Sequence, residues 1–198
     1  MFACVSCLKE GDETIVLPII ETSVPRDVIP DSIQEQFSFF DFDLFEGDTP
    51  PNIEGRYLLS PLMKVYSSDN YSVDFFTDLY FGFEQQGARG AVSYFESQND
   101  TVSGRSVSAR VVGHDDCFTM YCYQYVGVED GKWRCKTATI VSGRVAKDGI
   151  HECKYAFVML EVKPGAAGIG PSLVPEGTMR IFCDGDGLAQ RIKEEGAL

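Results

Sequence analysis

The clearest structural signal in the chain is the stretch FTMYCYQYVGVEDGKWRCKTATIVSGRV, residues 118–145. Its two halves, Phe118–Val128 and Trp133–Val145, are rich in β-branched and aromatic residues, which favour β-strands. The dipeptide Asp130-Gly131 between them is typical of a tight turn that joins two antiparallel strands. The stretch therefore predicts a long β-hairpin.

Similar segments, separated by turn-forming residues, continue on both sides of this hairpin. The remaining predicted strands are Tyr57–Tyr66, Val73–Glu84, Ala91–Glu96, Val102–Val112, Ile150–Val162 and Gly177–Phe182. No helical periodicity longer than two turns interrupts them before Leu188. We therefore expect an all-β fold, either an antiparallel, lipocalin-like barrel or a two-layer β-sandwich of about eight strands.

One predicted strand must be covered on both faces. The run Tyr155–Leu160 is apolar at every position, whereas a strand with one solvated face alternates polar and apolar residues. We expect it to lie between two layers, or in a barrel wall whose outer face is covered by the acidic N-terminal arm or by a short C-terminal helix at Leu188–Glu194, which Asp186 would cap. A short N-terminal helix is also predicted around residues 31–39, where Ser32 and Glu35 form a capping box.

Acidic residues are concentrated near the N-terminus. The 198 residues include 30 acidic and 17 basic ones, a formal net charge of −13, and residues 1–50 hold eleven of the acidic but only two of the basic side chains. With a turn cluster near residues 47–52, this distribution predicts an acidic N-terminal tether or arm with a short helix at residues 1–50 and an antiparallel β domain at residues 51–198. Nucleic-acid binding requires a basic surface, so we expect no nucleic-acid partner.

The cysteines fall into two groups. Five lie in the predicted β domain: Cys117, Cys122, Cys135, Cys153 and Cys183. Their spacing matches no zinc motif, so we expect no metal site, and buried thiols of this kind pack as small apolar side chains.

The other two cysteines, Cys4 and Cys7, lie at the start of the chain. Ser6-Cys7 followed by an acidic stretch is typical of the junction at which a bacterial lipoprotein is acylated, although residues 1–6 are too short for the apolar segment that precedes such a junction. Cys7 is therefore the predicted lipidation site. No apolar run is long enough to span a bilayer, so the only membrane contact we expect is through this lipid anchor.

Alternating tyrosines are the candidate ligand-binding residues. Tyr121, Tyr123 and Tyr125 share one face of a predicted strand, where they could stack on a sugar ring or pack in the core. The sequence contains no nucleophile elbow, HExxH or phosphate-binding loop, so we predict no catalytic residue and no cofactor.

Three carboxylates of one predicted strand are candidates for the catalytic groups of an enzyme. Asp74, Asp78 and Glu84 are evenly spaced along a predicted strand and would share one face. Paired carboxylates hydrolyse glycosidic bonds when they face one cleft, so a hydrolase acting on glycans or peptides is the alternative function.

Four segments of the chain resemble an uncharacterised family of secreted or surface lipoproteins of gut Bacteroidota. They are Thr49–Pro61, Thr137–Gly143, Tyr155–Leu160 and Met179–Leu188. The resemblance implies an acylated cysteine, an acidic tether, a β-rich body and a location in the cell envelope, anchored by lipid in the outer membrane or at the cell surface. It supplies no catalytic residue.

The function class that we expect is a non-catalytic binding module of the cell envelope. Its partner would be a glycan, a small apolar ligand or a protein, held against preformed aromatic side chains. The alternatives are the hydrolase and a structural envelope subunit, and the oligomeric state is not predicted.

Overall fold

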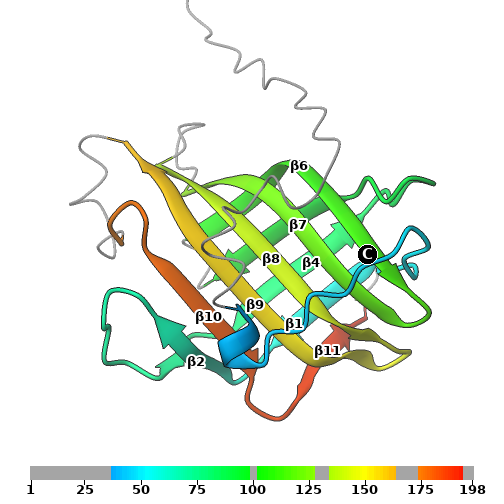
Figure 1. Ribbon diagram of the computed structural model, residues 1–198, viewed down its shortest axis with the longest axis horizontal. Helices are drawn as coiled ribbons and strands as arrows, with labels where there is room; N and C mark the ends of the chain where they lie inside the picture. The colour runs from blue at the N-terminus through cyan, green and yellow to red at the C-terminus, as the bar shows by residue number, and fades with distance from the viewer. Residues whose placement is uncertain (1–36, 99–101, 128–133, 164–173, 194–198) are drawn as a thin grey trace, which may run out of the picture.

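A computed structural model describes residues 37–98, 102–127, 134–163 and 174–193 of the chain (Figure 1). This part of the chain is all-β and is dominated by one large antiparallel sheet. In chain order its elements are the 3-10 helix η2 (Ser38–Phe40) and the strands β1 (Gly55–Leu59), β2 (Leu62–Ser67), β3 (Phe75–Phe76), β4 (Leu79–Glu84), β5 (Ser93–Gln98), β6 (Val102–His114), β7 (Cys117–Val126), β8 (Cys135–Val145), β9 (Gly149–Val162), β10 (Met179–Asp184) and β11 (Leu188–Ile192).

Most strands pair with their neighbours along the chain. From β4 to β9 each strand pairs with the next one, and β1 pairs with β4. The first half of β9 pairs with β11, where His151 lies opposite Leu188, and its second half pairs with β10, where Val158 lies opposite Met179. Because β11 also pairs with β1, it joins the two ends of the row of strands from β1 to β9. Beyond β10 the sheet continues into β2 and β3.

The long strands have an inner face that carries the larger core. On β7 this face presents Phe118, Met120 and Cys122, which pack with Tyr57 of β1 and Phe83 of β4. The rings of Phe83 and Phe118 meet edge to face with their centroids 6.0 Å apart. Figure 1 shows the corresponding arrangement, with β1 and β4 behind β7 and β8.

The outer face of β7–β10 is apolar as well. It carries a second cluster that includes Tyr121, Ile140, Val158 and Ile181, one from each of these four strands. In the run Tyr155–Leu160 of β9, alternate residues therefore pack in the outer cluster. The residues between them pack in the larger core or, for Met159, in a small third cluster, which explains why the run is apolar at every position.

Residues 37–50, here called the covering segment, lie over this outer face. Figure 1 shows the segment running across β9 and β8. Its residues Phe37 and Phe42 are only 1% and 3% exposed, and their rings are 4.8 Å apart. Further along, the backbone N–H of Phe45 donates to Oγ1 of Thr119 on β7, at 2.7 Å. The N-terminal segment, one of the alternatives that the sequence left open, thus covers the outer face of β9.

Two of the predicted strands are interrupted. The predicted strand Tyr57–Tyr66 is β1 and β2, divided at Ser60-Pro61, because proline has no N–H to donate to a neighbouring strand. The predicted strand Val73–Glu84 is β3 and β4, divided at Thr77-Asp78. The expectation that Asp74, Asp78 and Glu84 share one strand face is therefore wrong, since only Glu84 lies in a strand.

The predicted C-terminal helix is also wrong. Leu188–Ile192 forms β11, in which Ala189 is fully buried. A helix of two turns has little stability of its own, whereas an extended segment satisfies the hydrogen-bonding edges of both β1 and β9. Asp186 accepts a hydrogen bond from the backbone N–H of Leu188 at 3.0 Å, so it shapes the turn before β11 instead of capping a helix.

The predicted N-terminal helix lies mostly outside the described residues. At the end of its range the chain forms η2, after which Asp41 has a left-handed backbone conformation. Within the described ranges, no helix is long and apolar enough to cross a membrane. The division into residues 1–50 and 51–198 stays a prediction, although residues 37–50 share a core with the sheet.

We expect Phe42→Ala to lower the free energy of unfolding by about 3 kcal/mol, because it removes a buried ring from the outer cluster. Phe39, which is 82% exposed in the same segment, provides the matched control, and Phe39→Ala should change this free energy by less than about 0.5 kcal/mol. Urea denaturation measures both. Equally small effects would mean that the covering segment does not stabilise the β domain.

Candidate functional site

A cavity of about 190 Å³ lies where β5 and β7 end and β8 begins. Its wall is mostly apolar, with Leu62, Phe76, Leu79, Val126, Phe157, Met159, Val174 and Phe182 as apolar members and Glu96, Gln98, Cys135, Thr137, Tyr155 and Arg180 as the others. Some of these residues, such as Glu96, are buried, and others, such as Gln98 and Phe157, are partly exposed. The cavity therefore extends from the surface into the inner core.

Aromatic rings form one side of this cavity. The ring of Phe182 on β10 stacks on that of Phe157 on β9, with centroids 6.1 Å apart. The same ring meets Phe76 edge to face at 5.0 Å and lies 5.9 Å from the ring of Tyr155. The four rings are thus a single packed group, held in place by three different strands.

The carboxyl group of Glu96 is a buried polar group of the wall. Its Oε2 accepts hydrogen bonds from the hydroxyls of Tyr94, at 2.6 Å, and Tyr155, at 3.0 Å. Its Oε1 accepts one from Nε2 of Gln124, at 2.9 Å, and Gln124 also donates to Thr139 at 2.8 Å. These residues of β5, β7, β8 and β9 are here called the Glu96 cluster.

One acceptor position of this carboxylate remains open. A carboxylate has two lone pairs on each oxygen. Both positions on Oε2 of Glu96 are taken by tyrosine hydroxyls, whereas Oε1 has Gln124 as its one donor among the described residues. The fourth position can accept one further hydrogen bond.

Burial governs the titration of the Glu96 cluster. Loss of hydration raises the pKa of Glu96, and the three hydrogen bonds that it accepts oppose this effect only in part. The pKa values of the Tyr94 and Tyr155 hydroxyls are raised as well, first by burial and then by the neighbouring Glu96. Both hydroxyls therefore stay protonated and act as donors.

Strand alternation and one glycine place the Glu96 cluster inside the sheet. Tyr94 and Glu96 are two residues apart on β5 and so point to the same face. Gly104 of β6 lies opposite Glu96, and a Cβ atom at this position would lie 2.5 Å from Oε1 of Gln124 and 3.2 Å from Cγ of Glu96. Because Gly104 has no side chain, the side chains of Glu96 and Gln124 can occupy the space next to it.

Arg180 contributes a positive charge that is already paired. Its Nη2 donates to Oδ2 of Asp69 at 2.7 Å, and this hydrogen bond lowers the pKa of Asp69 to about 2. The guanidinium also lies over the ring of Tyr71, 4.4 Å from its centroid. Its Nε is buried and has no hydrogen-bond partner in the described part of the chain.

The predicted ligand-binding tyrosines lie on the other face of β7. Tyr121 belongs to the outer cluster, and Tyr123 packs against this cluster and has Nζ of Lys136 4.8 Å from its ring centroid. Neither of these residues, nor Tyr125, lines the cavity. Their shared face agrees with the sequence analysis, and their role in binding a ligand stays a prediction.

A second cleft, of about 380 Å³, separates part of the covering segment from β9 and β10. Its lining includes four carboxylates, from Asp41, Asp43, Glu152 and Asp184. Both oxygens of Asp184 accept backbone N–H groups, from Ser60 and Asp186, each at 3.1 Å. Burial raises the pKa of Asp184 to about 6.

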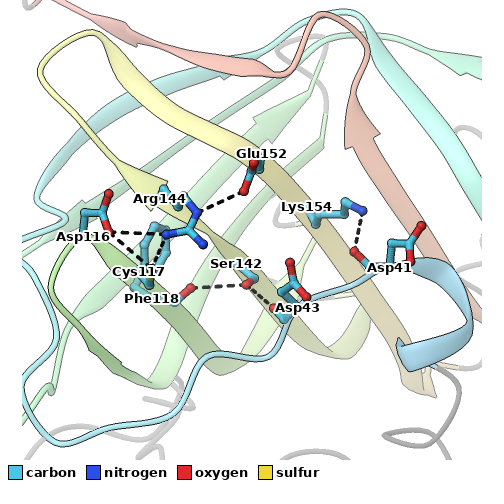
Figure 2. Close-up of polar contacts among 9 residues, drawn as sticks. All are labelled: Asp41, Asp43, Asp116, Cys117, Phe118, Ser142, Arg144, Glu152 and Lys154. Atoms are coloured by element: carbon cyan, nitrogen blue, oxygen red, sulfur yellow. Dashed lines mark hydrogen bonds and ion pairs between the residues drawn. The ribbon is translucent and has the colours of Figure 1, made fainter.

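Figure 2 shows how the covering segment is attached beside this cleft. The Ser142 hydroxyl of β8 donates to the backbone carbonyl of Asp43, and the Lys154 ammonium of β9 donates to that of Asp41. Nearby, Arg144 donates to Glu152 at 3.1 Å and lies 5.3 Å from the ring centroid of Phe45. The polar groups at this cleft therefore act mainly in holding the segment on the sheet.

The five cysteines of the β domain are free thiols. Four of them are buried, and Cys183 is partly exposed. Among the described residues, no group of three or more His, Cys, Asp or Glu side chains is placed to hold a metal ion. The predicted lipidation site, Cys7, lies outside the described residues.

We expect Glu96→Gln to become more stable relative to the wild type as the pH rises from about 5 to about 8. The pKa of Glu96 is higher in the folded protein than in the unfolded chain, so its stabilising contribution is fully present below the unfolded pKa and is lost as the pH rises through the folded pKa. The variant has no such dependence, and its new amide can pair with Gln124, whose Oε1 has no partner. Urea denaturation across this range measures the difference, and parallel pH curves would contradict the prediction.

Comparisons with known proteins give no information on the function of this chain. No protein-family model, no curated protein and no solved structure matches the chain. The resemblance to surface lipoproteins accordingly stays a prediction.

Proposed function

We propose that this protein is a non-catalytic binding module that holds a small, largely apolar ligand in the cavity beside Glu96. The observation that carries the proposal is an aromatic wall next to a buried carboxylate with one open acceptor position. Sites for small molecules commonly combine such apolar walls with a few polar groups that fix the orientation of the ligand.

A barrel rather than a sandwich is the architecture that we propose for this module. The pairing of β11 with both β1 and β9 supports a sheet that closes on itself. In that arrangement β1, β4, β5, β6, β7, β8, β9 and β11 form the wall, and the inner face encloses the cavity. A barrel of about eight strands has room for one small ligand.

The size of the cavity limits the ligand to about one ring or a short branched chain. An apolar cavity of about 150 Å³ in another protein holds one benzene molecule. The present cavity, at about 190 Å³, is somewhat larger than that. Among the partners expected from the sequence, a small apolar ligand therefore fits better than a glycan chain or a protein.

The hydrolase alternative has weaker support. Its best location is the second cleft, where four carboxylates lie and where the pKa of Asp184 is raised. The two oxygens of Asp184 are, however, engaged by backbone N–H groups, which suits a structural role. In the cavity itself, Glu96 is the one carboxylate among the described lining residues, so a two-carboxylate mechanism lacks its partner there.

Blocking the cavity tests the proposal with toluene as the probe. We expect toluene to bind the wild type, and Val126→Phe, which places a ring in the cavity wall, to weaken this binding by about tenfold or more. Val65→Phe is the matched control on the exposed side of β2 and should leave binding unchanged. Titration followed by NMR measures the affinities, and melting temperatures verify folding. Absence of toluene binding to the wild type, or equal binding to Val126→Phe, would overturn the proposal.

We also propose that the module is anchored in the cell envelope by a lipid on Cys7. The support is the Ser6-Cys7 junction and the acidic stretch that follows it. When the gene with its native upstream region is expressed in a Bacteroidota host, we expect labelled fatty acid to be incorporated into the wild type and into Cys4→Ala but not into Cys7→Ala. Label that persists in Cys7→Ala would refute this assignment.

A further inference from the structure

We infer that the ligand of the cavity carries a protonated amine that binds the open acceptor position on Oε1 of Glu96. This inference rests on the proposed function and adds the chemical class of the ligand. A small aromatic or branched aliphatic ammonium ion has the matching chemistry, with a cationic donor at one end and an apolar body at the other.

The first argument is charge. Three neutral donors, from Tyr94, Tyr155 and Gln124, stabilise the carboxylate of Glu96, but none of them carries a positive charge. Across residues 37–98, 102–127, 134–163 and 174–193, no lysine, arginine or histidine forms an ion pair with Glu96. A buried ion without a counter-ion is unfavourable, and a cationic ligand would remove this cost by pairing with it.

The second argument is the aromatic wall. The rings of Phe76, Tyr155, Phe157 and Phe182 lie in the same cavity as the carboxylate. Aromatic faces attract ammonium groups, and rings gathered around a pocket are a common means of recognising them. The Tyr155 side chain contributes to both features, because its hydroxyl donates to Glu96 while its ring packs against Phe182.

The positive charge of Arg180 does not contradict this assignment. Although Arg180 lines the same cavity, Asp69 pairs with its guanidinium at 2.7 Å, and the ring of Tyr71 covers it. Glu96, by contrast, has no such partner among the described residues. When Glu96 is deprotonated, the uncompensated charge at this site is therefore negative, and it selects a cation over an anion of the same shape.

Three ligands of one shape test the inference: benzylammonium, benzyl alcohol and benzoate, titrated calorimetrically at neutral pH. We expect benzylammonium to bind the wild type about tenfold more tightly than benzyl alcohol, because a hydrogen bond between two charged groups is stronger than one with a neutral donor. We expect benzoate to bind most weakly. Equal affinities for the ammonium ion and the alcohol, or tighter binding of benzoate, would overturn the inference.

Two variants identify the anchoring group. Glu96→Gln removes the buried charge and should abolish the preference for benzylammonium over benzyl alcohol. Glu84→Gln makes the same change at an exposed position on β4 and should keep that preference. A preference that persists in Glu96→Gln would assign the cation to another group and overturn the inference.

Toluene separates the failure of this inference from the failure of the proposed function. Binding of toluene to Glu96→Gln verifies that its cavity is intact. If toluene binds the wild type but benzylammonium binds no more tightly than benzyl alcohol, the inference of an amine ligand fails, whereas the proposal that the cavity binds a ligand stands. If none of these compounds binds the wild type, both proposals fail.

Discussion

In their central parts, strands β7, β8 and β9 are buried on both faces. Their inner side chains meet β1 and β4, and their outer side chains meet the covering segment. Two apolar faces on adjacent strands would leave a large exposed patch if either cover were absent. The N-terminal part of the chain therefore cannot act only as a tether, because residues 37–50 complete the second core. This constraint also fixes which side of each strand faces the cavity.

The Glu96 cluster is a buried polar group beside the inner core, and Glu96 lines the cavity. Glu96 and Gln124 occupy positions that alternation assigns to the core, and Gly104 provides the space between them. A carboxyl group in such a place is unfavourable unless hydrogen bonds surround it, and here two tyrosines and one amide do so. The wall of the cavity is thus polar near this group and near Arg180 and mostly apolar elsewhere.

Much of the fold could be predicted from the sequence, because strand composition and turn dipeptides act locally. The hairpin of β7 and β8 and the apolar strand β9 are examples. The break between β1 and β2 has a signal in the sequence, because Pro61 has no N–H to donate to a neighbouring strand. The extended conformation of Leu188–Ile192 had none, because it depends on the edges of β1 and β9, which are distant in sequence.

The candidate site was much harder to predict. The predicted tyrosines lie on the outer face of β7, whereas Gln124 lies in the inner row with Met120, Cys122 and Val126. A polar residue in an otherwise apolar row was the one available signal. That Glu96 of β5 and Tyr155 of β9 meet Gln124 depends on the arrangement of strands far apart in the chain, which composition and spacing do not encode.

The free thiols have a consequence for the environments that this protein tolerates. Outside the reducing cytosol an unpaired cysteine is a hazard chiefly where oxidants or other thiols can reach it. Cys117, Cys122, Cys135 and Cys153 are buried, and burial raises the pKa of each, so little reactive thiolate forms. Packing therefore protects these four thiols of the folded protein against oxidation and wrong pairing, and the partly exposed Cys183 is the remaining cysteine of the described residues that such reagents can reach.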